Sequence, residues 1–356
     1  MTTSSRISPC LWLVGARPRT LPASIAPVAV GAAAAWRSVL PPACPELFPQ
    51  PGWCTAAQMR YQMFGSRFWV VTVLCAAVAL LLQIAVNFAN DYSDGIRGSD
   101  ANRGESSGES SGEPTAKASV RSGADPSRPG AFQRLVASGV PPRLVLAAAG
   151  VASGAACVCG LAAIAVTRAW WLLAVGAVSL LAGWFYTGGR HPYGYAGFGE
   201  LSVFAFFGLA AVLGTEYALT GGLDPPGALG AVCCGLNAVM LLMVNNLRDL
   251  NDDRAHGKRT LAVRLGERAA RAALAVCAAS EVLVGAAAGW LLWGAVGAAA
   301  MLIAGAVLPW RLARCAWARA FRPAFMAASG QSLAFAALFV LCAVLPAMVP
   351  GLFLGV

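Results

Sequence analysis

Two stretches of the chain carry carboxylates and amides at a spacing suited to metal and phosphate chemistry. The first is NFANDYSDGIRGSD, residues 87–100, and the second is NNLRDLNDD, residues 245–253. Each begins with Asn, and an Asp follows four residues later. Residues four apart lie on one face of a helix. We therefore predict two rows of oxygen donors, made of Asn87, Asp91 and Asp94 in one motif and Asn245, Asp249 and Asp253 in the other.

Such rows of oxygen donors suit a hard divalent cation. Mg²⁺ is usually held by a few carboxylates together with substrate phosphates. The alternative is that these are solvated loop acids, but six of the 16 Asp and Glu residues fall within the two short motifs. We therefore predict a Mg²⁺ site that uses Asp91, Asp94, Asp249 and Asp253, with Asp100 as a further ligand.

Basic residues follow each acidic motif. Arg97 comes after the first, and the string GKRT, which contains Lys258 and Arg259, comes after the second. Arginine suits bidentate phosphate contacts, and lysine supplies a point charge. Lys258 is one of only two lysines in the chain, which favours a catalytic diphosphate role over general positive charge. GKRT lacks the upstream glycine of a phosphate-binding P-loop.

Aromatic and basic residues near two other predicted helix ends are further candidates. The string WFYTGGRHPYGYAGFGE contains Tyr186, Arg190, Tyr193 and Tyr195. These residues can form a substrate pocket, with glycines that allow close backbone approach, or an interfacial aromatic belt. Arg17, in ARPRT near the N-terminus, is either a pocket residue or a snorkelling anchor.

The composition requires membrane helices to position these residues. Of the 356 residues, 58% are hydrophobic and 12% are charged, whereas soluble domains have roughly 25% charged residues. A helical span needs about 20 mostly apolar residues. We predict an all-α, polytopic membrane protein with nine spans, at residues 20–36, 68–89, 144–166, 169–187, 197–219, 227–247, 269–288, 290–312 and 328–349.

The distribution of positive charge predicts the orientation in a cell membrane. If the N-terminus is cytoplasmic, all but four of the 26 Lys and Arg residues fall in cytoplasmic segments, as the positive-inside rule expects. Both acidic motifs then lie on the cytoplasmic side and the C-terminus on the outer side. The net charge of +10 is explained by this topology, and nucleic-acid binding is not needed. The four exceptions are Arg37, Arg60, Arg67 and Arg168.

The rest of the chain is predicted to form a single membrane domain, residues 1–356, with two long connections. Residues 38–66, rich in Pro and aromatic residues, are predicted to form an outer loop. Residues 102–130 are of low complexity and are predicted to be a disordered cytoplasmic insertion. Cys44 and Cys54 share the outer loop and are candidates for a disulfide if it faces an oxidising compartment.

Five strings together resemble the UbiA-type intramembrane prenyltransferases, and most closely the branch that uses 1,4-dihydroxy-2-naphthoate as acceptor. They are GARPRTLPASIAPVAVG, NFANDYSDGIRGSD, RLVASG, YTGGRHPYGYAGFGE and NNLRDLNDDRAHGKRTLAVRLG, and they extend over most of the chain. The resemblance implies nine helices around a central cavity open to lipid. It also implies Mg²⁺ bound by the aspartate motifs and a polyprenyl diphosphate held by the metal.

The resemblance further implies a reaction and a set of substrate-binding residues. The allylic diphosphate ionises, the naphthoate ring attacks the carbocation, and CO₂ leaves to give demethylmenaquinone. An apolar cavity keeps water from quenching the cation. The implied substrate-binding residues are Asn87, Asn90, Arg97, Arg134, Asn245, Arg259, Arg17, Tyr186, Arg190, Tyr193 and Tyr195.

Two other functions remain open from the sequence. One is a related prenyltransferase with another acceptor, such as 4-hydroxybenzoate, homogentisate or a tetrapyrrole. The other is an ion-coupled transporter, which would place polar residues near mid-span along a pathway through both leaflets. The clustering of acids at one predicted membrane border favours the enzyme.

Overall fold

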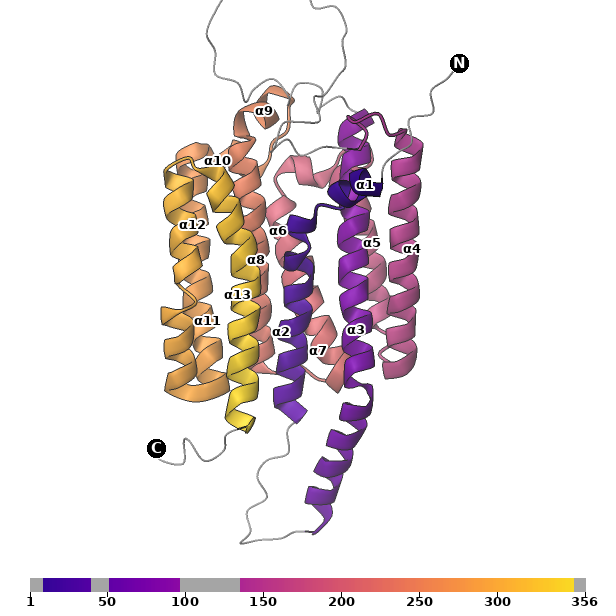
Figure 1. Cartoon of the computed structure of the whole chain (residues 1–356), viewed down its shortest axis with the longest axis vertical. Helices are drawn as coiled ribbons and strands as arrows, with labels where there is room; N and C mark the ends of the chain where they lie inside the picture. The colour runs from indigo at the N-terminus through magenta and orange to yellow at the C-terminus, as the bar shows by residue number, and fades with distance from the viewer. Residues whose placement is uncertain (1–8, 40–50, 97–134, 349–356) are drawn as a thin grey trace, which may run out of the picture.

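The structure, a computed structural model, describes residues 9–39, 51–96 and 135–348. In these ranges the chain is helical, without a β-strand, and most helices run along one common direction (Figure 1). The long helices are α2 (Pro22–Val39), α3 (Pro51–Ile96), α4 (Pro142–Thr167), α5 (Leu172–Thr187), α7 (Ala211–Thr220), α8 (Pro225–Arg248), α11 (Glu267–Ile303), α12 (Val307–Trp317) and α13 (Phe321–Met348). The short elements are α1 (Pro9–Gly15), η1 (Pro18–Thr20), η2 (Tyr193–Ala196), α6 (Gly199–Val203), η3 (Phe204–Ala210), α9 (Leu250–Ala255) and α10 (Leu261–Leu265).

Length and composition make this a multi-pass membrane protein. Six helical stretches of the described chain are long and apolar enough to cross a bilayer, and α5 is a shorter apolar helix. One of the six, residues 267–317, covers two of the predicted spans. Every predicted span falls mainly on helical residues, so the all-α membrane class is confirmed. The count of nine spans stays a prediction.

A sharp backbone break separates the seventh and eighth predicted spans. Trp293 and Gly294 leave the helical conformation within α11, and Gly294 has a φ of 56°. A positive φ carries no steric cost for glycine, because glycine has no Cβ. The chain therefore reverses direction at this point and returns along the bundle through the end of α11 and α12 (Figure 1).

Helix α8 is the central helix, and it carries the second acidic motif at its end. Of its most apolar stretch, 72% is buried, compared with 17% for α3. It packs against α2, α11, α13 and η3. Gly208 of the π-helical segment η3 makes a close approach possible, because a Cβ there would lie 2.6 Å from the carbonyl oxygen of Ala231. The second motif is therefore supported from several sides.

One predicted connection is shorter in the structure. Helix α3 begins at Pro51, so residues 51–66 are helical and do not belong to the predicted outer loop at 38–66. The proline at the start of the segment suggested a loop, but proline is also common at the first helical position, where its missing N–H costs nothing. The predictions for Cys44 and for the insertion at 102–130 lie outside the described residues.

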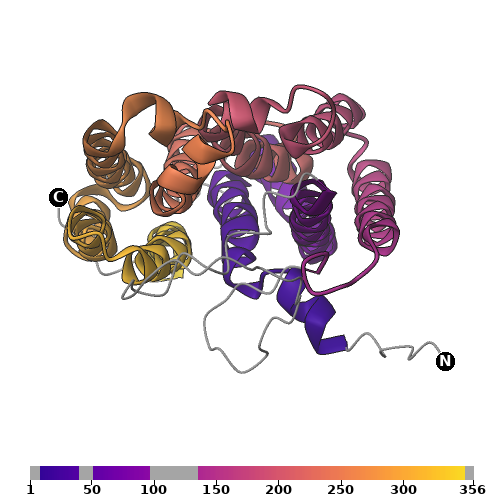
Figure 2. The ribbon, with the colours of Figure 1, turned by 90° about the horizontal axis from the view of Figure 1, so that it is seen from above.

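The two acidic motifs lie at the same end of the helical bundle. In Figure 1 the C-terminal end of α3, helix α9 and helix α1 are all at the top, whereas α13 ends at the bottom. Seen along the bundle in Figure 2, α3, α4 and α5 occupy one side, α12 and α13 the other, and α8 and α9 lie between them. This arrangement matches the predicted location of both motifs on one side of the membrane.

Candidate active site

The first motif forms the last turns of α3 and is buried despite its polarity. Asn87, Asp91 and Asp94 are 3%, 2% and 7% exposed. All three lie on one face of the continuous helix, as their spacing predicted. Burial of several polar side chains at one helix end is costly unless each finds partners. The partners of each residue therefore indicate what the site is built to hold.

Asn87 fastens α3 to the segment between α1 and α2. Its Nδ2 donates to the carbonyl oxygen of Ala16 at 2.9 Å and to Thr20 Oγ1 at 3.3 Å. Its Oδ1 accepts from Gln83 Nε2, one turn earlier on α3, at 3.0 Å. The amide thus positions the short segment that carries Arg17, whose backbone is left-handed with a φ of 53°. Asn87 therefore fixes the chain on both sides of Arg17.

Asp91 connects the first motif to the beginning of the next described segment. Its Oδ2 accepts a hydrogen bond from the backbone nitrogen of Leu135 at 2.6 Å. A hydrogen bond to a buried carboxylate is strong, because one partner is ionised. Leu135 is therefore fixed beside the motif and is itself fully buried. Arg97, Asp100 and Arg134, three of the predicted ligands, lie outside the described residues.

Asp94 is the point at which three distant segments meet. Its Oδ1 accepts from the Tyr195 hydroxyl at 2.5 Å and from Lys258 Nζ at 3.3 Å. The Lys258 ammonium also lies 4.4 Å from the centroid of the Tyr195 ring, within the range of a cation–π contact. Both side chains of the Asp94–Lys258 ion pair are about nine-tenths buried. A predicted catalytic lysine thus contacts a predicted metal ligand directly.

The second motif keeps helical hydrogen bonding across the junction of α8 and α9. The backbone nitrogen of Asp249 donates to Asn245, and that of Asp253 donates to Asp249. Asn245, Asp249 and Asp253 therefore retain the four-residue spacing that predicted a common face. Asp253 is 5% exposed. Asp249 accepts from Arg248 through both carboxylate oxygens, each at 2.8 Å.

The two motifs converge around the aromatic string. Tyr186, at the end of α5, packs edge-to-face against Tyr193 of η2, with ring centroids 5.6 Å apart. Lys258 Nζ donates to Asp94 of the first motif at 3.3 Å. The backbone nitrogen of Lys258 donates to the carbonyl oxygen of Asp253 at 2.8 Å, and that of Arg259 donates to Tyr195 at 2.8 Å. The GKRT string therefore lies along η2 and joins both motifs, as the proposal of a shared site requires.

The other residues of the aromatic string hold η2 in place. The Tyr193 hydroxyl donates to the carbonyl oxygen of Ala182 at 2.8 Å and shares a hydrogen bond with Ser202 Oγ at 2.8 Å. Burial raises the pKa of Tyr193, and the Ser202 contact offsets part of that effect. Gly194 allows close approach, because a Cβ there would lie 2.6 Å from the carbonyl oxygen of Tyr186. Tyr193 is therefore a positioning residue.

Arg190 and Arg259 are both exposed at the same end of the bundle. Neither side chain forms a hydrogen bond or ion pair within the described ranges of the chain, although the Arg259 carbonyl accepts from Arg264. Their predicted contacts to a diphosphate or a carboxylate stay predictions. Asn90 is engaged, because its Oδ1 accepts from Thr187 Oγ1 at 2.9 Å.

The carboxylate and amide oxygens are of the type that binds hard cations, but in the described residues they are not clustered into a complete metal site. No group of three acidic, His or Cys side chains is close enough to hold a metal among the residues that the structure describes. Asp94 and Asp249 accept from Lys258 and Arg248 instead. The oxygen donors are compatible with a divalent cation bound by few carboxylates, with substrate phosphates completing its shell.

Several partners of the motif residues were not predicted from the sequence. Gln83 and Thr20 hold Asn87, and Arg248 pairs with Asp249. Gln83 was detectable, because it lies one helical turn before Asn87 on the same face. Thr20 was not, because the pair is separated by 67 residues. Glu200 is also buried nearby and accepts from Asn246 at 2.9 Å.

A multi-pass helical membrane protein whose two Asn- and Asp-containing motifs meet at one end of the bundle has the architecture of an intramembrane prenyltransferase. The chain belongs to the UbiA prenyltransferase family, whose sequence profile matches residues 51–337. The predicted family is therefore confirmed.

Sequence relatives support the same assignment. The chain is 41% identical over 261 residues to a 1,4-dihydroxy-2-naphthoate octaprenyltransferase of Mycobacterium tuberculosis, covering 73% of this chain and 71% of the relative. An Escherichia coli protein of the same name is 35% identical over 265 residues, covering 73% of this chain and 70% of the relative. The apo structure of a UbiA homolog from Aeropyrum pernix K1 shares the fold, with a TM-score of 0.58 at 17% identity, over 89% of this chain and 97% of the homolog.

Proposed function

We propose that this prenyltransferase transfers a polyprenyl group from its diphosphate to 1,4-dihydroxy-2-naphthoate. The observation that carries the proposal is the contact of Lys258 and Tyr195 with Asp94, which joins the two acidic motifs to the basic string. Relatives named for this reaction, at 35–41% identity over most of the chain, support the acceptor. The length of the prenyl chain is left open in the proposal.

The reaction breaks one carbon–oxygen bond and one carbon–carbon bond, and it forms one carbon–carbon bond. The allylic C–O bond breaks, and its electron pair leaves with the diphosphate. The ring carbon that bears the carboxylate attacks the allylic cation, and the C–CO₂⁻ bond then breaks, so that its electrons restore the aromatic ring. The product is the quinol form of demethylmenaquinone. Mg²⁺, when bound, supplies Lewis-acid stabilisation of the leaving diphosphate.

The chain's own residues supply the binding and the electrostatics. We assign Asp91, Asp94, Asp249 and Asp253 to the metal, and Lys258 to the diphosphate. Lys258 is preorganised, because the Tyr195 ring and Asp94 fix its ammonium within a buried site. A fixed positive charge in such a site stabilises developing negative charge without reorganisation.

Other residues of the chain are assigned to binding and orientation. Arg97, Arg134 and Arg259 are proposed as further diphosphate contacts. We also assign Tyr186 and Arg190 to the acceptor, and we propose that Arg190 binds its carboxylate.

The reaction site is proposed to face the cytoplasm from the cell membrane. Both motifs and the Arg-rich turns lie at one end of the bundle, and α13 ends at the other (Figure 1). The positive-inside rule assigns the end with more Arg and Lys to the cytoplasm. A thiol-reactive, membrane-impermeant probe tests this orientation on single cysteines in a cysteine-free variant. A cysteine placed at His256 should be protected in intact cells, and one placed at Gly222 should be labelled.

An acceptor panel tests the proposed reaction. The purified full-length protein is incubated with a polyprenyl diphosphate, Mg²⁺, and either 1,4-dihydroxy-2-naphthoate, 4-hydroxybenzoate or homogentisate. We expect turnover of the naphthoate only, with release of labelled CO₂ from its carboxyl group, and loss of turnover with EDTA until Mg²⁺ is restored. Turnover of hydroxybenzoate but not of the naphthoate would overturn the acceptor, and turnover in excess EDTA would overturn the metal.

A further inference from the structure

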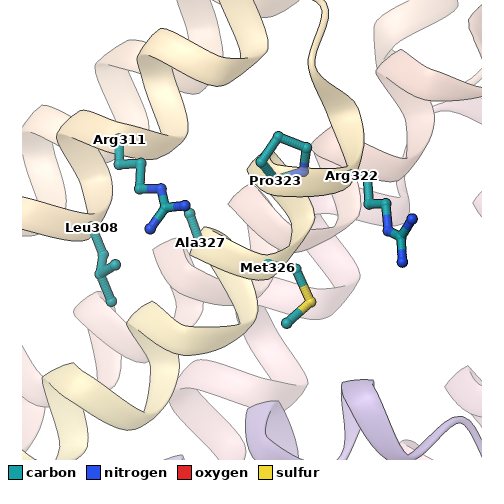
Figure 3. A pocket seen from close by; sticks show the side chains of 6 residues that line it. All are labelled: Leu308, Arg311, Arg322, Pro323, Met326 and Ala327. Carbon is teal, nitrogen blue, oxygen red and sulfur yellow. The ribbon is translucent and has the colours of Figure 1, made fainter.

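A surface groove lies between α12 and α13, away from both acidic motifs. It encloses about 540 Å³ and is open to the outside. Figure 3 shows Arg311 of α12 and Arg322 of α13 on opposite sides of the groove, with apolar side chains between them. None of its residues belongs to either motif or to the GKRT string. The groove is lined by Leu308, Arg311, Arg322, Pro323, Met326 and Ala327.

The two arginines of the groove have no acidic partner among the residues that the structure describes. Arg311 and Arg322 are both exposed, and neither forms an ion pair or a hydrogen bond with any residue in the described ranges. Nearby arginines behave differently, because Arg271 and Arg319 both pair with Glu267. Within the described ranges, Arg311 and Arg322 therefore differ from Arg271 and Arg319 in having no carboxylate beside them. An anion bound in the groove would supply a counter-charge to both side chains.

Exposed tryptophans of α12 lie close to the groove in the sequence. Trp310 and Trp317 of α12 are 67% and 48% exposed and lie on either side of Arg311 in the sequence. Exposed tryptophans are typical of the membrane interface. Arg322 stands at the N-terminal end of α13, where the positive end of the helix dipole also favours an anion. Met326, 54% exposed, continues the groove toward the membrane centre with an apolar side chain.

We propose that this groove binds an anionic glycerophospholipid, with its phosphate at Arg311 and Arg322 and an acyl chain along Leu308 and Met326. The charge of the arginines selects an anionic headgroup. The apolar side chains between the arginines favour a lipid over a soluble anion, because an acyl chain that packs on them buries apolar surface. Basic pockets between helices on the cytoplasmic side are a recurring form of lipid site. This proposal does not depend on the acceptor or the reaction assigned above.

The test measures lipid binding to the full-length protein. Native mass spectrometry in a neutral detergent gives the dissociation constant for phosphatidylglycerol, with phosphatidylcholine as the neutral lipid. We expect the Arg311→Gln/Arg322→Gln double variant to bind phosphatidylglycerol about 25-fold more weakly, at about fivefold for each arginine, without a change for phosphatidylcholine. Arg268→Gln is the matched control, because Arg268 is an exposed arginine at the same end of the bundle but outside the groove.

Three results would overturn the proposal. The first is a double variant that binds phosphatidylglycerol as the wild type does. The second is an equal loss in Arg268→Gln, which would indicate general surface charge. The third is competition by soluble glycerol phosphate at the concentration at which the lipid binds, which would indicate a free-phosphate site. If the double variant does not fold, the two single variants carry the same comparison, and Arg311→Lys/Arg322→Lys should retain most of the binding.

Discussion

Replacing Tyr195 with phenylalanine isolates the contact between the aromatic string and the first acidic motif. The change removes the 2.5 Å hydrogen bond from the Tyr195 hydroxyl to Asp94 and leaves the aromatic ring beneath Lys258. Asp94 is only 7% exposed, so water does not readily replace the lost donor. A hydrogen bond to a charged group is worth about 1.5–3 kcal/mol. At about 1.36 kcal/mol for each factor of ten, the expected loss in kcat/KM is roughly 10- to 150-fold.

The assay is prenyl transfer by the purified protein, with Tm measured in parallel. Tyr193→Phe is the control, because the Tyr193 hydroxyl bonds to Ala182 and Ser202 rather than to a motif carboxylate. We expect it to lower Tm with a smaller loss of kcat/KM than Tyr195→Phe. Activity of Tyr195→Phe within about twofold of the wild type would refute the reasoning that Asp94 must be held by this hydroxyl.

A double-mutant cycle with Lys258→Met extends the same test. Tyr195 and Lys258 both donate to Oδ1 of Asp94, so their effects on kcat/KM should not be additive. Residues that share a partner typically show coupling of about 0.5–3 kcal/mol. Additive effects within about 0.3 kcal/mol would show that the two side chains act independently of each other and would contradict coupling through Asp94.

Two further changes test the packing around the site and in the membrane interior. Asn87→Leu removes the hydrogen bonds to Ala16 and Thr20, so the segment that carries Arg17 loses its anchor. We expect Tm to fall by a few degrees and KM for the diphosphate to rise. An unchanged Tm and KM would contradict this expectation. Gln331→Leu removes the donor to both carboxylate oxygens of buried Glu281, each at 3.1 Å, and should destabilise the protein by about 0.5–2 kcal/mol. Thermal unfolding in detergent measures it, and a Tm equal to that of the wild type would show that Glu281 is satisfied without Gln331.

The helical segments and their membrane character were predictable because both depend on local composition. Runs of apolar residues long enough to cross a bilayer specify helices, since an unpaired backbone is costly in lipid. The prediction was wrong where local cues were ambiguous. Pro51 was assigned to a loop, yet it begins α3, because proline suits both a turn and a first helical position.

The donor types and the faces of the motifs were also predictable from the sequence. The four-residue spacing of Asn87 and Asp91, and of Asn245 and Asp249, is a property of any helix that contains them. Their partners were not predictable. Asp94 contacts Tyr195 and Lys258, which are 101 and 164 residues away in the sequence. No local sequence pattern indicates which side chains meet over such separations.

The sequence by itself determined a helical membrane protein with two oxygen-rich helix ends and an excess of positive charge on one side. Those properties follow from periodicity and from the partition of side chains between lipid and water, which act on each segment separately. Only the tertiary structure decided that Asn87 holds the Arg17 segment, that Tyr193 supports η2, and that Arg311 and Arg322 line one groove. These roles depend on which helices are neighbours, and that is settled by the packing of small and large side chains along the whole bundle.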